Sequence, residues 1–99
     1  MFEETARQWV REMFKEGKLG GCDEEFLKQL TKDYARQLEE FFICEVKKNL
    51  EKSGKVGEFE RMLLYDSQYI NKYLNQSIPG YPGFRTNVFD RARKIILGS

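Results

Sequence analysis

Histidine is absent from this chain of 99 residues, and proline occurs only twice. Without histidine, neither a Ser-His nor a Cys-His nucleophile pair can be built, and the commonest metal ligand is missing. A phosphate-binding glycine loop is missing as well, because Gly17, Gly20 and Gly21 are too loosely spaced and no strand precedes them. These absences predict a protein that is not an enzyme, with no catalytic residues, no cofactor and no bound metal.

Long apolar runs are also lacking. None exceeds four or five residues, whereas a membrane-spanning helix needs about twenty. The acidic start, Met1 to Glu4, has neither the basic charge nor the apolar stretch of a signal peptide. We therefore expect a cytoplasmic protein with no membrane contact.

Cysteine is scarce, with one residue at position 22 and one at position 44. If Cys22 precedes a long helix and Cys44 lies on it, the helical rise separates them by about 33 Å. No intramolecular disulfide spans that distance. The spacing predicts two free thiols, with Cys44 as a small residue of the core.

The chain also has almost no net charge, because 17 Lys and Arg side chains balance 16 Asp and Glu side chains to a net charge of +1. The two parts of the chain differ: residues 1–44 carry seven basic and ten acidic side chains, and residues 45–99 carry ten and six. The total indicates no strong field for a nucleic acid or an anionic membrane. A mildly basic face is expected near the C-terminus.

Residues 23–52 contain neither Gly nor Pro and predict one long helix. Asp23 is a good N-cap, and Ser53-Gly54 is expected to end the helix. Around this central helix we predict an all-α fold, a small single-domain bundle of four to five helices that covers residues 1–99. The turn from Phe41 to Cys44 is apolar on every side, which places the centre of the fold there and requires cover from more than one direction.

The remaining helices follow from periodicity and turn residues. Apolar residues between positions 2 and 16 recur at the spacing of an amphipathic helix. Residues 58–76 predict either one kinked helix or two short ones. Ile78 to Gly83 holds both prolines and is expected to be a rigid, extended loop, with Pro82 placed to start a final helix that ends at Gly98.

Aromatic residues are the informative excess. Eight Phe, five Tyr and one Trp are more than a core of this size easily hides, so some rings should lie in a groove or an interface. The candidate interaction surface consists of Ile43, Tyr65, Tyr69, Tyr73, Tyr81 and Phe84. It favours a small non-enzymatic protein–protein interaction module that binds a protein partner or self-associates. Whether the chain's own helices or another molecule cover Ile43 is left open.

A nucleic-acid-binding protein is the alternative. Its candidate contacts are the basic side chains of the last helix, Arg85, Arg91, Arg93 and Lys94. Apolar residues occupy one face of that helix, and Asp90 interrupts the remainder. The near-zero total charge makes this the less favoured prediction.

Two motifs resemble a known family. The first is the acidic-hydrophobic segment Glu58 to Leu64, which follows the long helix, and the second is the helix end Leu74-Asn75-Gln76-Ser77-Ile78-Pro79. With the last amphipathic helix, this order of features between Glu24 and Leu97 resembles a small uncharacterised family found mostly in candidate-phyla bacteria such as Parcubacteria. The resemblance implies a helical fold and supplies no activity.

Overall fold

The computed structural model describes residues 2–21 and 23–98, and every regular element among them is a helix. In chain order these are α1 (Glu3–Lys15), α2 (Glu24–Glu51), α3 (Val56–Tyr65), a 3₁₀ turn η1 (Ser67–Tyr69), α4 (Ile70–Ser77) and α5 (Tyr81–Leu97). The prediction of an all-α fold around one long central helix is confirmed. Residues 58–76 form two helices joined by the 3₁₀ turn, which answers the question that the sequence left open.

The long helix α2 begins where its cap predicts. The Asp23 side chain accepts a hydrogen bond of 2.8 Å from the backbone N–H of Phe26, and Glu24 and Glu25 add negative charge to the first turn. At the other end, Gly54 has a φ of 69°, in the left-handed region that suits glycine after a helix. Both ends of α2 are therefore determined locally.

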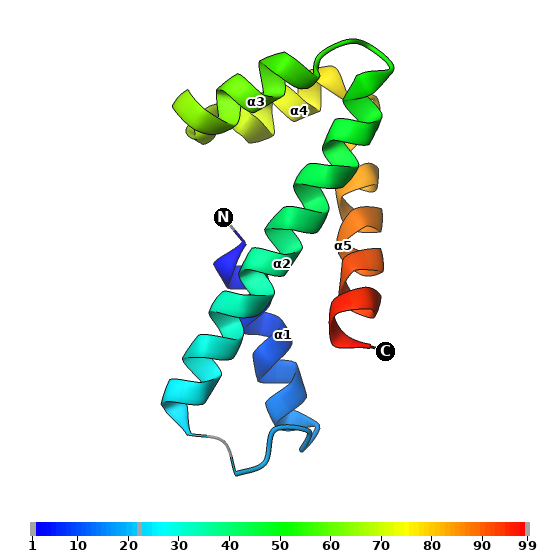
Figure 1. Ribbon diagram of the computed structural model, residues 1–99. Helices are drawn as coiled ribbons and strands as arrows, with labels where there is room; N and C mark the ends of the chain where they lie inside the picture. Colours follow the sequence, from blue (N-terminus) through cyan, green and yellow to red (C-terminus); the bar gives the residue numbers. More distant parts are fainter. Residues whose placement is uncertain (1, 22, 99) are drawn as a thin grey trace.

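The other helices pack on different parts of α2 (Figure 1). Helix α1 runs along its N-terminal half, and α5 lies along another side. At the far end, α3 and α4 lie side by side and extend away from α2 as a helical hairpin, residues 56–77. The molecule is elongated, with principal extents of 48 × 26 × 17 Å.

Three phenylalanine rings join α2 to the two ends of the chain. Phe42 packs edge-on against Phe2 with the ring centroids 5.0 Å apart, and against Phe89 at 5.9 Å. Phe2 and Phe89 also meet edge-on at 5.1 Å. Phe42 is only 2 % exposed. The rings of α2, α5 and the residue before α1 thus form one cluster, at the middle of the central helix.

The apolar turn of α2 is covered unevenly. Phe42 is fully buried, Phe41 and Ile43 are half-buried, and Cys44 is exposed. The prediction that Cys44 belongs to the core is wrong, because a residue two positions from Phe42 points about 200° away from it. The prediction for Cys22 lies outside the described residues.

The connection between α4 and α5 is shorter than expected. Only Ile78, Pro79 and Gly80 separate the two helices, and α5 already begins at Tyr81. Gly80 precedes α5 with a φ of 66°, and Pro82 lies in the first turn, where its missing N–H costs no hydrogen bond. The prediction that Pro82 starts the last helix is confirmed, whereas the extended loop through Gly83 is wrong.

Candidate interaction surface

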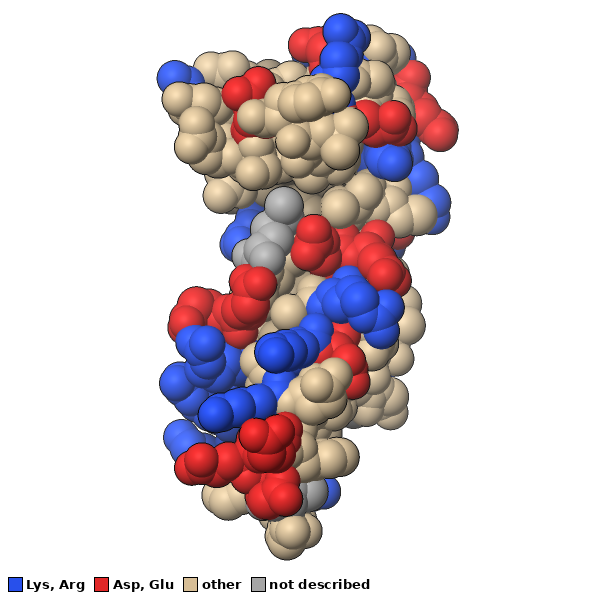
Figure 2. Space-filling model, turned by 60° about the vertical axis from the view of Figure 1, so that its left-hand side comes forward, with Lys and Arg blue, Asp and Glu red and all other residues tan. Residues whose placement is uncertain are grey.

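Three exposed large apolar side chains lie at the free end of the α3–α4 hairpin. Leu64 is 75 % exposed, Tyr65 is 78 % exposed and Tyr69 is 54 % exposed. They lie in the last turn of α3 and in the 3₁₀ turn, which form the end of the hairpin farthest from α2 (Figure 1). Figure 2, in which this side comes forward, shows few charged side chains on the hairpin and many along the lower part of the molecule.

Two adjoining hollows run along the hairpin, from its free end back toward α2. The first hollow, of about 370 Å³, is lined by Met62, Asp66, Tyr69, Lys72, Tyr73 and Gln76. The second hollow, of about 320 Å³, is lined by Glu58, Arg61, Met62, Tyr65 and Asp66. Because Met62 and Asp66 line both, the hollows are continuous. We call the two hollows together with Leu64 the hairpin-tip surface.

Charged side chains of both signs surround the tyrosines. Two are acidic, Glu58 and Asp66, and two are basic, Arg61 and Lys72. Among the ion pairs between described residues, none involves these four side chains. By contrast, Glu60 on the same helix pairs with Lys47 of α2 at 3.4 Å. The hairpin-tip surface therefore offers two charges of each sign to an incoming molecule.

The structure brings three of the six predicted interaction residues together, namely Tyr65, Tyr69 and Tyr73. Tyr81 is only 3 % exposed and packs against the half-buried Phe84, with ring centroids 6.3 Å apart. These two residues lie in the first turns of α5, and their rings are turned toward the core. They therefore serve mainly the fold and are not part of the exposed surface at the end of the hairpin.

Ile43 lies elsewhere, in a separate shallow hollow with Glu39, Leu63, Ser67 and Gln68. It is half-buried and packs against the core cluster. The chain's own helices thus provide part of the cover that the sequence required for Ile43.

Burial changes the chemistry of Tyr81. Loss of water around its hydroxyl raises the pKa of Tyr81, and the positive charge of nearby Arg85 opposes this in part. The hydroxyl makes no hydrogen bond of good geometry within the described residues. Tyr81 therefore stays protonated to higher pH than a free tyrosine.

Sequence reasoning missed Met62, Leu64 and the four charged residues of the hairpin-tip surface. A signal for Leu64 was present, since Phe59, Met62 and Leu63 already fill the inner face of a helix of ten residues. Leu64 and Tyr65 must then point outward, because neighbouring helical residues differ by about 100°. The charges carried no such signal, since their proximity depends on how α3 and α4 pack.

The basic residues proposed for nucleic-acid contact are mostly engaged within the molecule. The Arg85 guanidinium lies 4.4 Å from the centroid of the Phe89 ring. Arg91 pairs with Glu45 of α2 at 3.1 Å, and Arg93 pairs with Glu12 of α1 at 2.5 Å. Lys94 is exposed. Arg91 and Arg93 thus hold α5 to its neighbours, and their charge is largely compensated.

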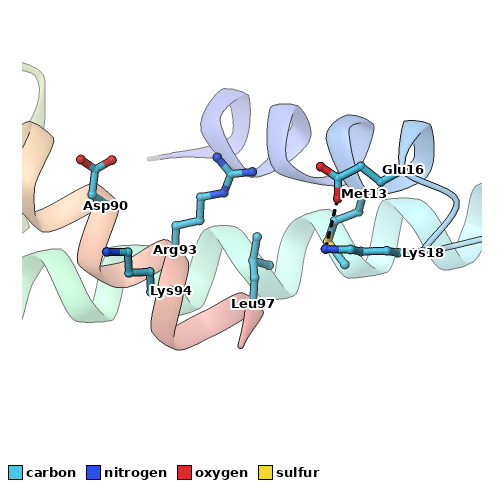
Figure 3. Close-up of a pocket in the computed structure, with 7 residues that line it drawn as sticks. All are labelled: Met13, Glu16, Lys18, Asp90, Arg93, Lys94 and Leu97. Carbon is cyan, nitrogen blue, oxygen red and sulfur yellow. Dashed lines mark ion pairs between the residues drawn. The ribbon is translucent and has the colours of Figure 1, made fainter. Parts of the chain in front are cut away.

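A cleft of about 400 Å³ opens between the C-terminal parts of α1 and α5 (Figure 3). Its apolar residues are Met13 and Leu97, and its charged residues are Glu16, Lys18, Asp90, Arg93 and Lys94. Glu16 already pairs with Lys18 at 3.1 Å, and it lies at the opposite end of the cleft from Asp90 in Figure 3. The two carboxylates cannot share a proton or a ligand at that separation.

Within residues 2–21 and 23–98, no group of three or more His, Cys, Asp and Glu side chains is arranged to hold a metal ion. No helix in the same ranges is long and apolar enough to cross a bilayer. Compared with known proteins, the chain matches no family model, no curated protein and no solved structure.

Proposed function

We propose that this protein is a small, non-enzymatic protein–protein interaction module, and that the hairpin-tip surface is its docking site. The observation that carries the proposal is the exposure of Leu64, Tyr65 and Tyr69 beside two continuous hollows. Tyrosine is enriched in protein interfaces, where its ring is buried and its hydroxyl meets polar groups at the edge.

The exposed area supports this proposal. Leu64, Tyr65 and Tyr69 together leave on the order of 400 Å² accessible, if a full tyrosine contributes about 200 Å². That exposed area is comparable to the largest apolar patches on monomeric proteins, which are often functional. Burying a large apolar side chain gains roughly 1.5 to 3 kcal/mol, so a partner that covers these three residues gains a useful part of its binding free energy there.

A matched pair of double variants tests the proposal. Tyr65→Ser/Tyr69→Ser removes both rings from the hairpin-tip surface, whereas Phe26→Ser/Ile95→Ser removes two side chains of similar exposure, 50 % and 67 %, at the other end of the molecule. Each variant and the unchanged chain are immobilised and used to capture proteins from the native host. We expect a partner that is retained by the unchanged chain and the control, and lost with the tyrosine variant.

Captured proteins are identified by mass spectrometry, and binding is repeated with purified components. If the tyrosine variant retains every protein that the unchanged chain retains, the hairpin-tip surface is not the docking site. Circular dichroism spectra of all three proteins must agree, so that a loss of binding is not a loss of folding.

The nucleic-acid alternative has less support, because Arg91 and Arg93 form ion pairs with α2 and α1. Titration of labelled DNA or RNA at low salt tests it directly, and binding that weakens steeply with salt would favour it over the proposal. A cytoplasmic location is also part of the proposal, and the free thiol of the exposed Cys44 is typical of a reducing compartment.

A further inference from the structure

A further hollow, of about 320 Å³, lies between α4 and the first turns of α5. Its lining consists of Asn71, Asn75, Tyr81, Pro82, Arg85 and Thr86, and it shares no residue with the hairpin-tip surface. The four hollows and clefts described above each have at least one Asp or Glu in their lining, whereas this one has none. Among its lining residues, Arg85 supplies the one full charge. We call it the α4–α5 hollow.

Arg85 is held in place without a counter-charge. Its guanidinium carbon lies 4.4 Å from the centroid of the Phe89 ring and 6.0 Å from that of Phe2. These ring contacts fix the position of the side chain and leave N–H groups of the guanidinium able to donate. Unlike Arg91 and Arg93, Arg85 forms no ion pair with a described residue. A positioned and uncompensated positive charge therefore lines the α4–α5 hollow.

The hydroxyl of Tyr81 lacks an acceptor. Tyr81 is 3 % exposed, and its hydroxyl has no hydrogen-bond partner of good geometry among the described residues. The positive charge of Arg85 acts on this hydroxyl, so the two groups are close. Arginine has no acceptor atom and cannot take the hydroxyl proton. Because a buried donor without an acceptor is destabilising, the orphaned hydroxyl indicates that an acceptor belongs beside Arg85.

Two other polar side chains of the lining already donate within the molecule. The Asn75 side chain donates to the backbone oxygen of Asn71 at 3.2 Å, and the Thr86 hydroxyl donates to that of Pro82 at 3.1 Å. The side-chain amide of Asn71 makes no hydrogen bond to a described residue. The donors left for a ligand are thus a guanidinium, a phenol and an amide, and together they select a negatively charged acceptor.

We propose that the α4–α5 hollow binds the carboxylate of a small organic acid, with Arg85 as its ion-pair partner and Tyr81 and Asn71 as further hydrogen-bond donors. A single guanidinium compensates a single negative charge, and its planar fork matches a carboxylate. A phosphate ester, with a charge of about −1.5 to −2 at pH 7, would be compensated only in part. The volume of the hollow is at the lower end of the range for ligand pockets, about 300 to 1,000 Å³, which limits the acid to a small one.

Titration of the ¹⁵N-labelled protein with sodium acetate tests this proposal. Amide signals are followed by NMR at about pH 7, and sodium chloride keeps the ionic strength constant. We expect saturable shifts of the signals of Asn71, Asn75 and Arg85, with a dissociation constant of about 1 to 10 mM for so small a ligand. Sodium chloride alone should give no saturable shift.

Three variants show which groups bind the acid. Arg85→Gln should weaken acetate binding by about tenfold or more, because the ion pair is lost. Lys94→Gln is the matched control, because it removes the same charge from the same helix at an exposed side chain that pairs with no described residue. It should change the dissociation constant less than about twofold. Tyr81→Phe keeps the ring and should weaken binding by about threefold or more.

The same titrations can overturn the proposal. It fails if no signal shifts saturably up to about 100 mM acetate, or if Arg85→Gln and Lys94→Gln weaken binding equally. Tighter binding of inorganic phosphate than of acetate would contradict the choice of a carboxylate, and an unchanged affinity of Tyr81→Phe would contradict the part given to the hydroxyl. Amide signals far from the hollow must agree between the variants, so that a loss of binding is not a loss of folding. The capture experiment on Tyr65 and Tyr69 is independent of these results.

Discussion

Replacing Phe42 with alanine should remove the side chain on which the packing of the central helix depends. Phe42 is only 2 % exposed and contacts Phe2 and Phe89 edge-on, with centroid distances of 5.0 and 5.9 Å. Phe42→Ala leaves a cavity at the junction of α2, α5 and the segment before α1. Two aromatic contacts are lost together with the buried ring.

The expected cost is about 4 kcal/mol, within the usual range of 3 to 5 for a buried Phe→Ala change. Each aromatic pair accounts for roughly 0.5 to 1.5 kcal/mol of that total. A domain of this size has a free energy of unfolding of about 5 to 15 kcal/mol, so the variant should be close to the limit of folding. Phe42→Leu keeps most of the volume and should cost about 1 to 2 kcal/mol, which keeps the effect measurable.

Urea unfolding followed by circular dichroism and by Trp9 fluorescence measures these values. Trp9 is the only tryptophan, is 5 % exposed and belongs to the same core. Phe41→Ala is the control, because Phe41 is half-buried on the next position of α2 and should cost about half as much as Phe42→Ala. The reasoning is refuted if Phe42→Ala costs less than about 1 kcal/mol, or if Phe41→Ala costs more than Phe42→Ala.

The other predictions concern the start of α5 and its contact with α2. Gly80→Ala should destabilise the protein by about 1 to 2 kcal/mol, because Gly80 has a left-handed φ of 66°. Gly57→Ala, inside α3, should be neutral or stabilising by up to about 1 kcal/mol. Equal changes in the free energy of unfolding, measured in urea, would contradict this prediction. Tyr81→Phe should reduce the loss of stability when the pH rises from about 9 to 11. The pKa of Tyr81 is raised in the folded state, so this residue contributes its full stability only below the pKa of about 10 that a tyrosine has in the unfolded chain. Parallel profiles of unfolding free energy against pH for the two proteins would disprove a role for Tyr81. A double-mutant cycle on Arg91→Ala and Glu45→Ala should give a coupling of about 0.5 to 1 kcal/mol, since the pair joins α5 to α2 but is partly exposed; a coupling of zero would show that solvent screens it completely.

The central helix could be predicted because its signals are local. The cap at Asp23, the absence of Gly and Pro over its length and the glycine after its end lie within a few residues of the features they determine. The same holds for Pro82 in the first turn of α5. A hydrogen-bonded cap and a fixed proline φ act within one helical turn, so they can be recognised without knowledge of the packing.

The sequence predicted that Tyr65 and Tyr69 belong to an exposed surface, because the chain has more aromatic rings than a core of this size can bury. The number of rings does not identify which of them stay exposed. Tyr81 was grouped with them because it is close in sequence, yet it lies in the first turn of α5 and is 3 % exposed. The error came from reading both prolines as parts of one loop, when the second proline is compatible with a helix.

The amino-acid sequence by itself determined that this protein is helical, where its long helix begins and ends, and that it has more aromatic surface than its core requires. Tertiary structure alone decided that Phe42, and neither Phe41 nor Cys44, is buried at the centre. It also decided that Glu58, Arg61, Asp66 and Lys72, none of which forms an ion pair with a described residue, lie beside the tyrosines of the hairpin. The physical reason is the range of the interactions. Helix formation and capping depend on neighbours along the chain, whereas burial and charge pairing depend on side chains that α1, α3, α4 and α5 bring together from distant positions.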